Sequence, residues 1–444
     1  MTPFSSADPP TAATLACPRR AAHSAPRSSL PPAEAPTPRA TPSALLALVK
    51  EAVVAPHAAA ARVPLPMHEP LSELQQRAED LEYSRLLDVA AAHPPRSRAR
   101  LATVAAFAVS AYAGVVRTGK PFAAVLGETF ELVRGGEEEG DGAPSAAGGG
   151  FRFLAEKVRA APRPLNHAIA HGAAGWSFEL EDELRMKFGA SAVELVPRVL
   201  VRVTFPDGEA FSWGKVTTTI HNATGLVGRM RLEHTGVCTV TSSTSGEACV
   251  LTFHAEGKGP GGRKAVREVS GVVVAAATAA PAAASPPLTL AGTWDGGLVA
   301  HGLADTPTPL WSSRAAATPG GWAALVASLG PHNRFGFGPW AAALNPPPPR
   351  TCGCEVASED PTAACCPAPH APLPASDSRL RPDLRALEHG RYPVAAAAKA
   401  GLEADEAAKA ATHQPTWFAA RPGVEAEVGV DFLYEYRGGY WAAA

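Results

Sequence analysis

The hydrophobic pattern predicts helices at both ends of the chain and a long β-rich middle. Leucines and alanines recur at helical spacing in residues 69–93 and 97–118. A shorter amphipathic helix is predicted at residues 43–54, where Ser43 is a suitable N-cap. Near the C-terminus, residues 395–411 again have a helical composition. The chain is therefore expected to combine helices with strands.

From Phe130 onward, the pattern changes to short β-branched and aromatic runs separated by Gly, Pro, Asp or Asn. Two separators, at residues 206–208 and 244–247, have the composition of hairpin turns. Successive hairpins at this spacing predict an antiparallel meander that curves into a barrel or large half-barrel. The runs are FRFLAEKV, AVELVPRVLVRVTF, EAFSWGKVTTTIHNA, GRMRLEHTGVCTVTSS, ACVLTFHAE and REVSGVVV.

Three low-complexity segments interrupt this pattern, at residues 135–150, 275–287 and 345–372. The first is rich in Gly and acidic residues and the others in Ala and Pro, so none has the apolar periodicity that packing requires. We expect all three to be surface insertions. The predicted organisation is a tail at residues 1–42 and one domain at residues 43–444.

The tail is rich in Pro, Ser, Ala and Arg and poor in acidic residues. It lacks the apolar segment of a secretory signal, and no transmembrane helix is expected in the chain. Two interpretations of the tail stay open, a disordered segment and an organellar transit peptide.

The chain has 40 basic and 42 acidic residues, which argues against a general nucleic-acid binder. Its seven cysteines do not resemble a secreted disulfide framework, so a reducing compartment is expected. Four of them cluster without CxxC spacing in a Pro/Ala-rich segment, so incidental thiols are favoured over a zinc site and no metal is predicted. These four are Cys352, Cys354, Cys365 and Cys366.

Catalytic signatures are not found in the sequence. Ser110, His221 and Glu256 are candidate nucleophiles or bases, but GxSxG, HExxH and paired-carboxylate patterns are missing. An enzyme is therefore not expected.

Several motifs in a fixed order resemble the oxysterol-binding protein family. TGKPFAAVLGETFEL, at residues 118–132, is similar to the family's GKPFNPLLGETYE signature. EPLSELQQRAEDLEYSRLLD is similar to EPLSMLQRLCEDLEYSELLD, and HNATGLVGRMRLEHTGVCTV to HNIIVGKLWIEHYGTVEI. LPASDSRLRPDLRALEHG is similar to LPPTDSRLRPDQRALEEG. The resemblance extends from about Pro64 to the C-terminus, outside the three segments.

This resemblance implies a mainly β fold with helices: a near-closed antiparallel β-barrel around a lipid tunnel, an N-terminal lid and a C-terminal helical subdomain. It implies binding of a sterol or another membrane lipid, intermembrane transfer, and in many members exchange for phosphatidylinositol 4-phosphate. No cofactor is implied. The resemblance favours a short form without a pleckstrin-homology domain, cytoplasmic and peripheral on organelle membranes, with plastid targeting by the tail as the open alternative.

By resemblance, residues 43–54 are the lid, with an ordinary packing helix as the alternative. The implied residues are Leu45, Leu46, Leu48 and Val49 for the lid, and Pro121, Phe122 and Leu126 for the tunnel entrance.

Lipid-headgroup residues are implied at two places. The KPF motif supplies Lys120, and KAGLEADEAAK supplies Lys399 and Glu403. The third position of the family's K-x3-E-x3-R pattern is Ala407, which cannot bind phosphate. Taken without the family, Lys399 and Glu403 have the spacing of an ordinary exposed i,i+4 pair.

The family's EQVSHHPP motif is degenerate here. Ala160 and Ala161 replace both histidines, and Arg163 separates the two prolines. Hydrogen bonds to charged groups contribute about 1.5–3 kcal/mol each, so phosphoinositide binding is expected to be weakened unless Arg159 or Arg163 replaces the histidines. Strand alternation puts Arg159 and Ala161 on one face. A lipid sensor or scaffold without net transfer is the alternative function.

Overall fold

The computed structural model describes residues 29–38, 63–114, 116–135, 150–161, 163–189, 192–223, 230–257, 266–275, 287–346, 373–424 and 428–441. The predicted lid, the cysteine cluster and almost all of the three low-complexity segments lie outside these residues. The tail and the domain limits therefore stay predictions.

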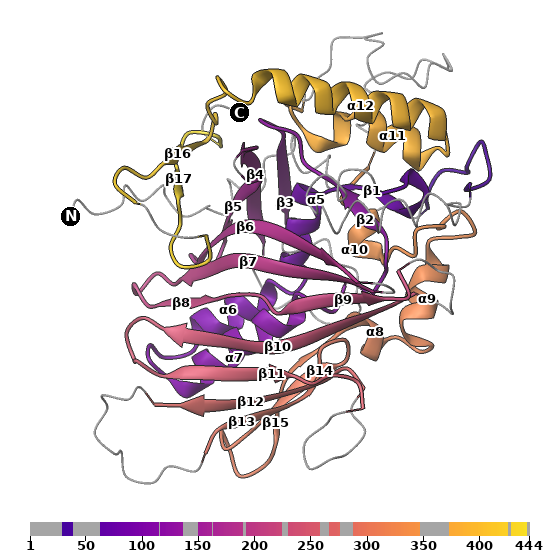
Figure 1. Cartoon of the computed structure of the whole chain (residues 1–444). Coiled ribbons are helices and arrows are strands. Elements are labelled where there is room, and N and C mark those ends of the chain that lie inside the picture. Colours follow the sequence, from indigo (N-terminus) through magenta and orange to yellow (C-terminus); the bar gives the residue numbers. More distant parts are fainter. Residues whose placement is uncertain are drawn as a thin grey trace.

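Thirteen strands in the described part of the chain form one antiparallel sheet (Figure 1). Their order follows the sequence, with β8 and β9 both placed between β7 and β10, so the predicted meander is confirmed. The strands are β3 (Thr129–Arg134), β4 (Phe151–Arg159), β5 (Leu165–Gly172), β6 (Ser177–Phe188), β7 (Ala192–Thr204), β8 (Ala210–Trp213), β9 (Thr217–His221), β10 (Arg231–Ser242), β11 (Ala248–Phe253), β12 (Glu268–Val274), β13 (Thr289–Thr293), β14 (Gly297–His301) and β15 (Thr308–Ser312).

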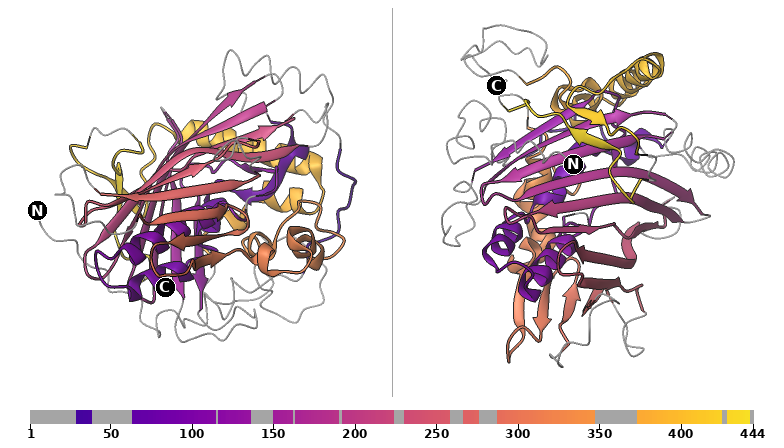
Figure 2. Two further views of the ribbon diagram at one scale, coloured as in Figure 1. Left: turned by 90° about the horizontal axis from the view of Figure 1, so that it is seen from below. Right: turned by 90° about the vertical axis from the view of Figure 1, so that its left-hand side faces the viewer.

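The sheet curves strongly but stays open. Its edge strands, β3 and β15, are not paired with each other in the described residues, so hydrogen bonds do not close the barrel. On the concave side lie α6 (Arg85–Ala92) and the almost completely buried α7 (Arg98–Ser110) (Figure 2). The Phe107 ring contacts Phe178 and Trp213 edge to face, at 6.3 and 6.1 Å between centroids. α7 therefore fills part of the space that the sheet encloses.

The helix predicted at residues 69–93 is interrupted. The structure has β1 (His68–Ser72), α5 (Glu73–Ala78), a short 3₁₀ turn (Glu79–Leu81) and then α6. Pro70 is unfavourable inside a helix, and Ser72 begins α5 with a capping box. The Ser72 hydroxyl accepts from the Leu74 N–H at 3.2 Å, and the Gln75 side chain accepts from the Ser72 N–H at 2.8 Å.

β1 pairs in parallel with β2 (Lys120–Phe122), which brings the EPLS and KPF motifs together. A 3₁₀ turn (Leu65–Met67) precedes β1. Helices α8 (Arg314–Ala317), α9 (Gly321–Ser328) and α10 (Pro339–Ala342) follow the sheet. A further 3₁₀ turn (Ser378–Leu380), α11 (Pro382–Glu388) and α12 (Tyr392–Lys409) then lie across the end of the sheet beside β1 and β2 (Figure 1). Among the described helices, none is both long and apolar enough to cross a bilayer.

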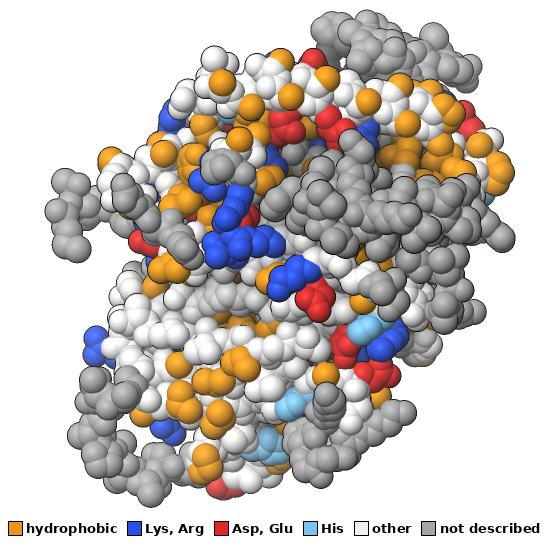
Figure 3. Space-filling model, in the orientation of Figure 1, with side chains coloured by type: hydrophobic (Ala, Val, Ile, Leu, Met, Phe, Trp, Pro, Cys, Tyr) orange, Lys and Arg blue, Asp and Glu red, His pale blue; other side chains and the backbone are white. Residues whose placement is uncertain are grey.

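The C-terminal hairpin, β16 (Phe418–Ala420) and β17 (Tyr434–Tyr436), covers the outer face of β4–β6 (Figure 2). Basic side chains gather beside it on the surface, and apolar side chains are exposed on the outer face further along the sheet (Figure 3). Val237, on β10, is 62% exposed, so this part of the sheet has no cover from described residues.

Buried polar groups lie between the hairpin and the sheet. Glu156, on β4, accepts the backbone N–H groups of Thr416 and Trp417 at 2.7 and 2.9 Å. On β5, Nδ1 of His167 lies 3.1 Å from Oε2 of Glu181, and Nε2 lies 3.2 Å from Oε1 of Glu179. The second contact has ion-pair distance but poor hydrogen-bond alignment. Burial would lower the pKa of His167, but the two carboxylates raise it to about 9.

The elevated pKa of His167 predicts a loss of stability at alkaline pH. The folded-state pKa of His167, about 9, lies above the ordinary value of 6.5. The stabilisation that protonated His167 provides is therefore complete below about pH 6.5 and is lost as pH rises through 9. Urea unfolding should show the free energy of unfolding falling by on the order of 2 kcal/mol between pH 7 and 10. The His167→Gln variant should lack this fall, and an equal fall in that variant would contradict the assignment.

Candidate functional site

A cavity lies between the concave face of the sheet and α5. The cavity has a volume of about 190 Å³. On the sheet side its lining is mainly apolar, because alternate residues of β6, β7, β9 and β10 face inward. Val193, for example, pairs with both Phe188 and Ile220, and all three line the cavity. This apolar wall also includes Leu184, Met186, Leu195, Pro197, Val199 and Leu232.

The opposite side of the cavity is polar. Glu73, Gln76, Arg77 and Asp80 line it from α5 and the turn that follows, because a spacing of three or four residues places side chains on one helix face. Lys120 and Pro121 extend this side along β2. The cavity is therefore two-sided, with an apolar sheet wall and a polar helix wall.

Two lysines lie close to the cavity-lining Lys120, and we call the three the lysine cluster: Lys120, Lys157 and Lys399. Lys157 faces inward, because its register neighbours on the next two strands are Asn166 and the cavity-lining Asp182. Burial lowers the pKa of Lys120, and the charges of Lys399 and Lys157 lower it further, against Glu73 and Glu403. The cluster therefore combines side chains from β2, β4 and α12.

Carboxylates accompany the lysine cluster. Burial would raise the pKa of Glu73, but Lys157 and Lys120 hold it below its usual value. Lys399 Nζ donates to Glu403 Oε1 at 2.5 Å, as expected for an i,i+4 pair. Burial raises the pKa of Glu406, the next carboxylate near Lys157. The lysine charges are thus largely compensated by neighbouring side chains.

Lys120, Lys399 and Glu403, predicted from the sequence, therefore lie together. Arg159 and Arg163 lie elsewhere, because a bulge between Lys157 and Arg159 reverses the alternation of β4. Arg159 pairs with Leu165, an outer-face residue, and its Nε donates to the Arg163 carbonyl at 3.1 Å. Nη1 of Arg163 lies 3.4 Å from Glu183. Both arginines are therefore on the outer face, away from the lysine cluster.

Lys157 is a candidate site residue that was not predicted from the sequence. It occupies the Gln position of the degenerate EQVSHHPP motif, and alternation alone would have put it on the same face as Arg159. The bulge that separates their faces leaves no clear signal in the sequence. The substitution of a lysine within the motif was the available clue.

The predicted entrance residues have different positions. Pro121 lines the cavity, whereas Phe122 is fully buried against Leu384 and Tyr392 of α11 and α12. The backbone N–H of Leu126 donates to the Glu406 carboxylate. Phe122 therefore supports the C-terminal helices rather than facing the cavity.

Glu128, in the LGE motif, connects the C-terminal helices to the sheet. Gly127 has φ of +81°, a conformation that favours glycine, and the turn that it forms directs Glu128 toward Arg381. Nη1 of Arg381 donates to Glu128 at 2.6 Å and to the Ala123 carbonyl at 2.8 Å. Its Nη2 donates to Asp383 at 2.6 Å. Burial would lower the pKa of Arg381, but the two carboxylates raise it.

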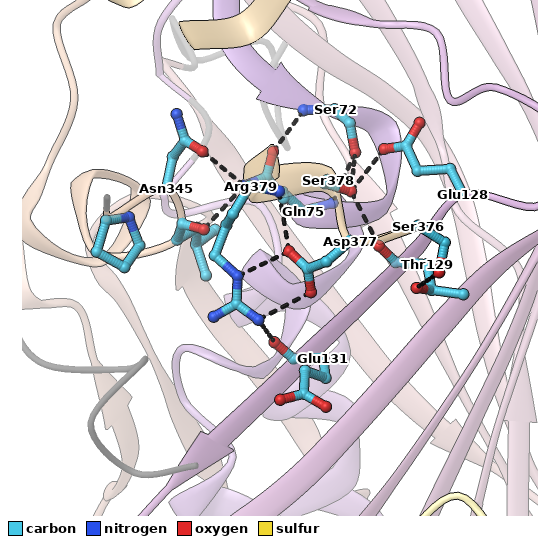
Figure 4. A network of polar contacts seen from close by, with 12 residues as sticks. Ser72, Gln75, Glu128, Thr129, Glu131, Asn345, Ser376, Asp377, Ser378 and Arg379 are labelled. Atoms are coloured by element: carbon cyan, nitrogen blue, oxygen red, sulfur yellow. Dashed lines mark hydrogen bonds and ion pairs between the residues drawn. The ribbon is translucent and has the colours of Figure 1, made fainter. Parts of the chain in front are cut away.

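The residues before Arg381 extend this connection (Figure 4). The Ser378 hydroxyl donates to Glu128 at 2.5 Å and lies 3.0 Å from the Ser72 hydroxyl at the start of α5. Arg379 donates to both oxygens of Asp377, at 2.8 and 2.9 Å, and to the Glu131 carbonyl at 3.1 Å. The network links β1, β3 and α11, and thereby fixes where α12 presents Lys399.

The three candidate catalytic residues have local partners. Ser110 donates to the Phe107 carbonyl within α7. His221 bonds Glu233 at 2.6 Å, and Glu256 pairs with Arg231. Within the described residues, no group of His, Cys, Asp and Glu has the arrangement of a metal site.

Comparison with known proteins identifies the class. A family model described as oxysterol-binding protein matches residues 60–444, and the chain belongs to that family. It is 33% identical to oxysterol-binding protein-related protein 2B of Arabidopsis thaliana, over 86% of this chain and 48% of the relative. It is 34% identical to human oxysterol-binding protein-related protein 7, over 77% of this chain and 34% of the relative. The chain thus spans about half the length of these curated relatives, or less.

Solved structures confirm the fold class. The Osh3 ORD from Saccharomyces cerevisiae, in complex with PI(4)P, is 26% identical with a TM-score of 0.66, and the match covers 94% of both chains. The Osh1 ORD domain in complex with ergosterol is 24% identical with a TM-score of 0.64, over 94% of this chain and 91% of that one. The mainly β fold with flanking helices is therefore as predicted.

Removing the Arg381 guanidinium should destabilise the protein strongly. Arg381→Ala leaves Glu128 and Asp383 as buried carboxylates without their partner, a change that typically costs about 3–5 kcal/mol. Urea unfolding should show a loss of that size. Arg85→Ala, at an exposed position of α6, is the control and should stay within about 0.5 kcal/mol. A loss below about 1 kcal/mol in Arg381→Ala would show that this link does not hold the helices.

Proposed function

We propose that the chain binds one membrane lipid, a sterol or another class, in the cavity and transfers it between membranes as a peripheral protein. The observation that carries this proposal is the apolar wall contributed by four strands beside a cluster of basic side chains. Apolar surface removed from water stabilises a complex by about 25 cal/mol per Å². The neighbours in complex with ergosterol, cholesterol and PI(4)P support a lipid ligand.

Phosphatidylinositol 4-phosphate binding is weakened in this proposal. Its phosphomonoester carries close to two negative charges and needs cations that are free to receive it. Here alanines occupy both histidine positions, and Lys399 is already paired with Glu403. An anionic headgroup must therefore displace Glu403 and compete with Glu73. We assign the remaining headgroup contacts to the lysine cluster, because Lys157 is on the concave side of the sheet and Arg159 and Arg163 face outward.

Liposome transfer tests both parts of the proposal. Donor vesicles of phosphatidylcholine carry either a fluorescent sterol or phosphatidylinositol 4-phosphate, and transfer to plain acceptor vesicles is followed over time. We expect neutral-lipid transfer to exceed phosphoinositide transfer. Phosphoinositide transfer as fast as that of a relative with the intact histidine pair would contradict the weakened site. Extraction without transfer would instead favour a sensor or scaffold.

The Lys157→Gln variant carries the glutamine of the family's EQVSHHPP motif. It lacks the ammonium group of Lys157 on the concave side of the sheet. The remaining phosphoinositide affinity should fall about tenfold, the effect of one lost charge-assisted hydrogen bond, while neutral-lipid transfer stays unchanged. Arg163→Gln is the matched control, because it removes one cation from the outer face of the same segment. Equal losses in both variants would contradict the role given to Lys157.

A further inference from the structure

Most of the polar side of the cavity consists of charged residues of both signs, and two of them are paired with opposite charges. We call it the charged wall: Glu73, Gln76, Arg77 and Asp80, with the partners Asp182 and Lys215. Nε of Arg77 donates to Asp182 at 2.9 Å, and Nζ of Lys215 donates to both oxygens of Asp80 at 2.6 and 2.5 Å. All six residues line the cavity, so a bound molecule contacts them.

Arg77 has unused hydrogen-bonding capacity, as a comparison with Arg117 shows. Arg117 donates through Nε and both Nη atoms to Glu69 and Glu79, and so is saturated by its neighbours. Arg77 uses Nε alone, and its two Nη nitrogens donate to no group in the described part of the chain. Its side chain is 12% exposed and lines the cavity. These nitrogens are therefore available to a ligand.

The charged wall offers donors and acceptors side by side. Arg77 and the Gln76 amide donate, whereas Glu73 and Asp182 are acceptor carboxylates. A hydroxyl group both donates and accepts, so it matches this mixture. An anionic group of a ligand would instead meet the carboxylates of Glu73, Asp80 and Asp182, which repel it. The chemistry therefore favours uncharged hydroxyl groups.

The extent of the charged wall indicates more than one hydroxyl. Residues 73 to 80 span about 10 Å at a helical rise of 1.5 Å per residue. A sterol presents a hydrocarbon edge over most of its length and would leave the two Nη nitrogens of Arg77 without acceptors, at a cost of about 1–3 kcal/mol per unsatisfied group. A ligand with several hydroxyls on one part and hydrocarbon on the other fits both walls.

We propose that the cavity takes a glycerolipid with an uncharged polyhydroxyl headgroup, such as a glycosyl diacylglycerol, with its hydroxyls on the charged wall. Its acyl chains would then lie on the apolar wall, against residues such as Leu184, Met186 and Leu195. This inference rests on the proposed function that a lipid occupies the cavity, and it names the class of that lipid.

Lipid extraction by the full chain tests the inference. Phosphatidylcholine vesicles contain, in separate arms, a monoglycosyl diacylglycerol, a diacylglycerol with the same acyl chains, cholesterol, or a polyhydroxylated sterol. Extracted lipid is quantified by mass spectrometry after the vesicles are removed. We expect at least tenfold more glycosyl diacylglycerol than diacylglycerol or cholesterol.

The double variant Arg77→Met with Asp182→Leu tests the charged wall itself. Replacing both partners leaves no unpaired buried charge, a change that folded proteins often tolerate. The preference for the glycosyl lipid over diacylglycerol should fall at least tenfold, and cholesterol extraction should rise. The control, Arg98→Met with Glu247→Leu, removes a surface ion pair between α7 and the β10–β11 turn and should change neither value.

Should the double variant fail to fold, Gln76→Leu provides a second test, because it removes a polar group of the charged wall without breaking an ion pair. We expect a loss of preference of about threefold. Cholesterol or polyhydroxylated sterol extracted as well as the glycosyl lipid by the unmodified chain would overturn the inference, and so would an unchanged preference in a folded variant. Extraction of no lipid at all would overturn the proposed function instead.

Discussion

The link between Arg381, Glu128 and Asp383 is the constraint on which the arrangement of the site depends. Lys120 and Lys399 are far apart in the sequence, and α11 and α12 must lie on β1 and β2 for the two to meet. Arg381 fixes that position with hydrogen bonds to Glu128 and the Ala123 carbonyl, on the loop that follows Lys120. Because all three charged groups are buried, the link tolerates little displacement. Phe122, the last residue of β2 before this loop, packs beneath α11 and α12, so polar and apolar contacts impose one geometry.

Once this geometry is fixed, the cavity has two chemically different walls. Strand alternation makes the sheet side apolar, whereas the helical spacing of α5 and the turn that follows it directs Glu73, Arg77 and Asp80 to the other side. Charge compensation is extensive in both the lysine cluster and the charged wall. Buried charges are expensive unless they are paired, so this pairing allows the cavity to contain them. Because of this pairing, an anionic ligand group must compete with the carboxylates already present. A neutral polar group does not have to compete with them.

Much of the fold follows from the sequence, because strand alternation and turn residues are local signals. The hairpins at residues 206–208 and 244–247 form as predicted, joining β7 to β8 and β10 to β11. The N-terminal helix prediction failed at Pro70 and Ser72, where apolar spacing was given more weight than a proline and a capping residue. Lys120, Lys399 and Glu403 could be predicted as site residues only through the family resemblance. Lys157 was not predicted, because a one-residue bulge decides whether Arg159 lies on the same face of the sheet. Arg77 was not predicted, because its partner, Asp182, is on a strand distant in the sequence.

The central claim is that this chain encloses a lipid that has no phosphomonoester. Native mass spectrometry of the protein, purified with the lipid that it acquires in cells, tests this claim most directly. We expect one lipid per chain, and fragmentation should release a species with hydroxyl groups and without a phosphomonoester. A chain that retains no lipid, or one that retains phosphatidylinositol 4-phosphate, would contradict it.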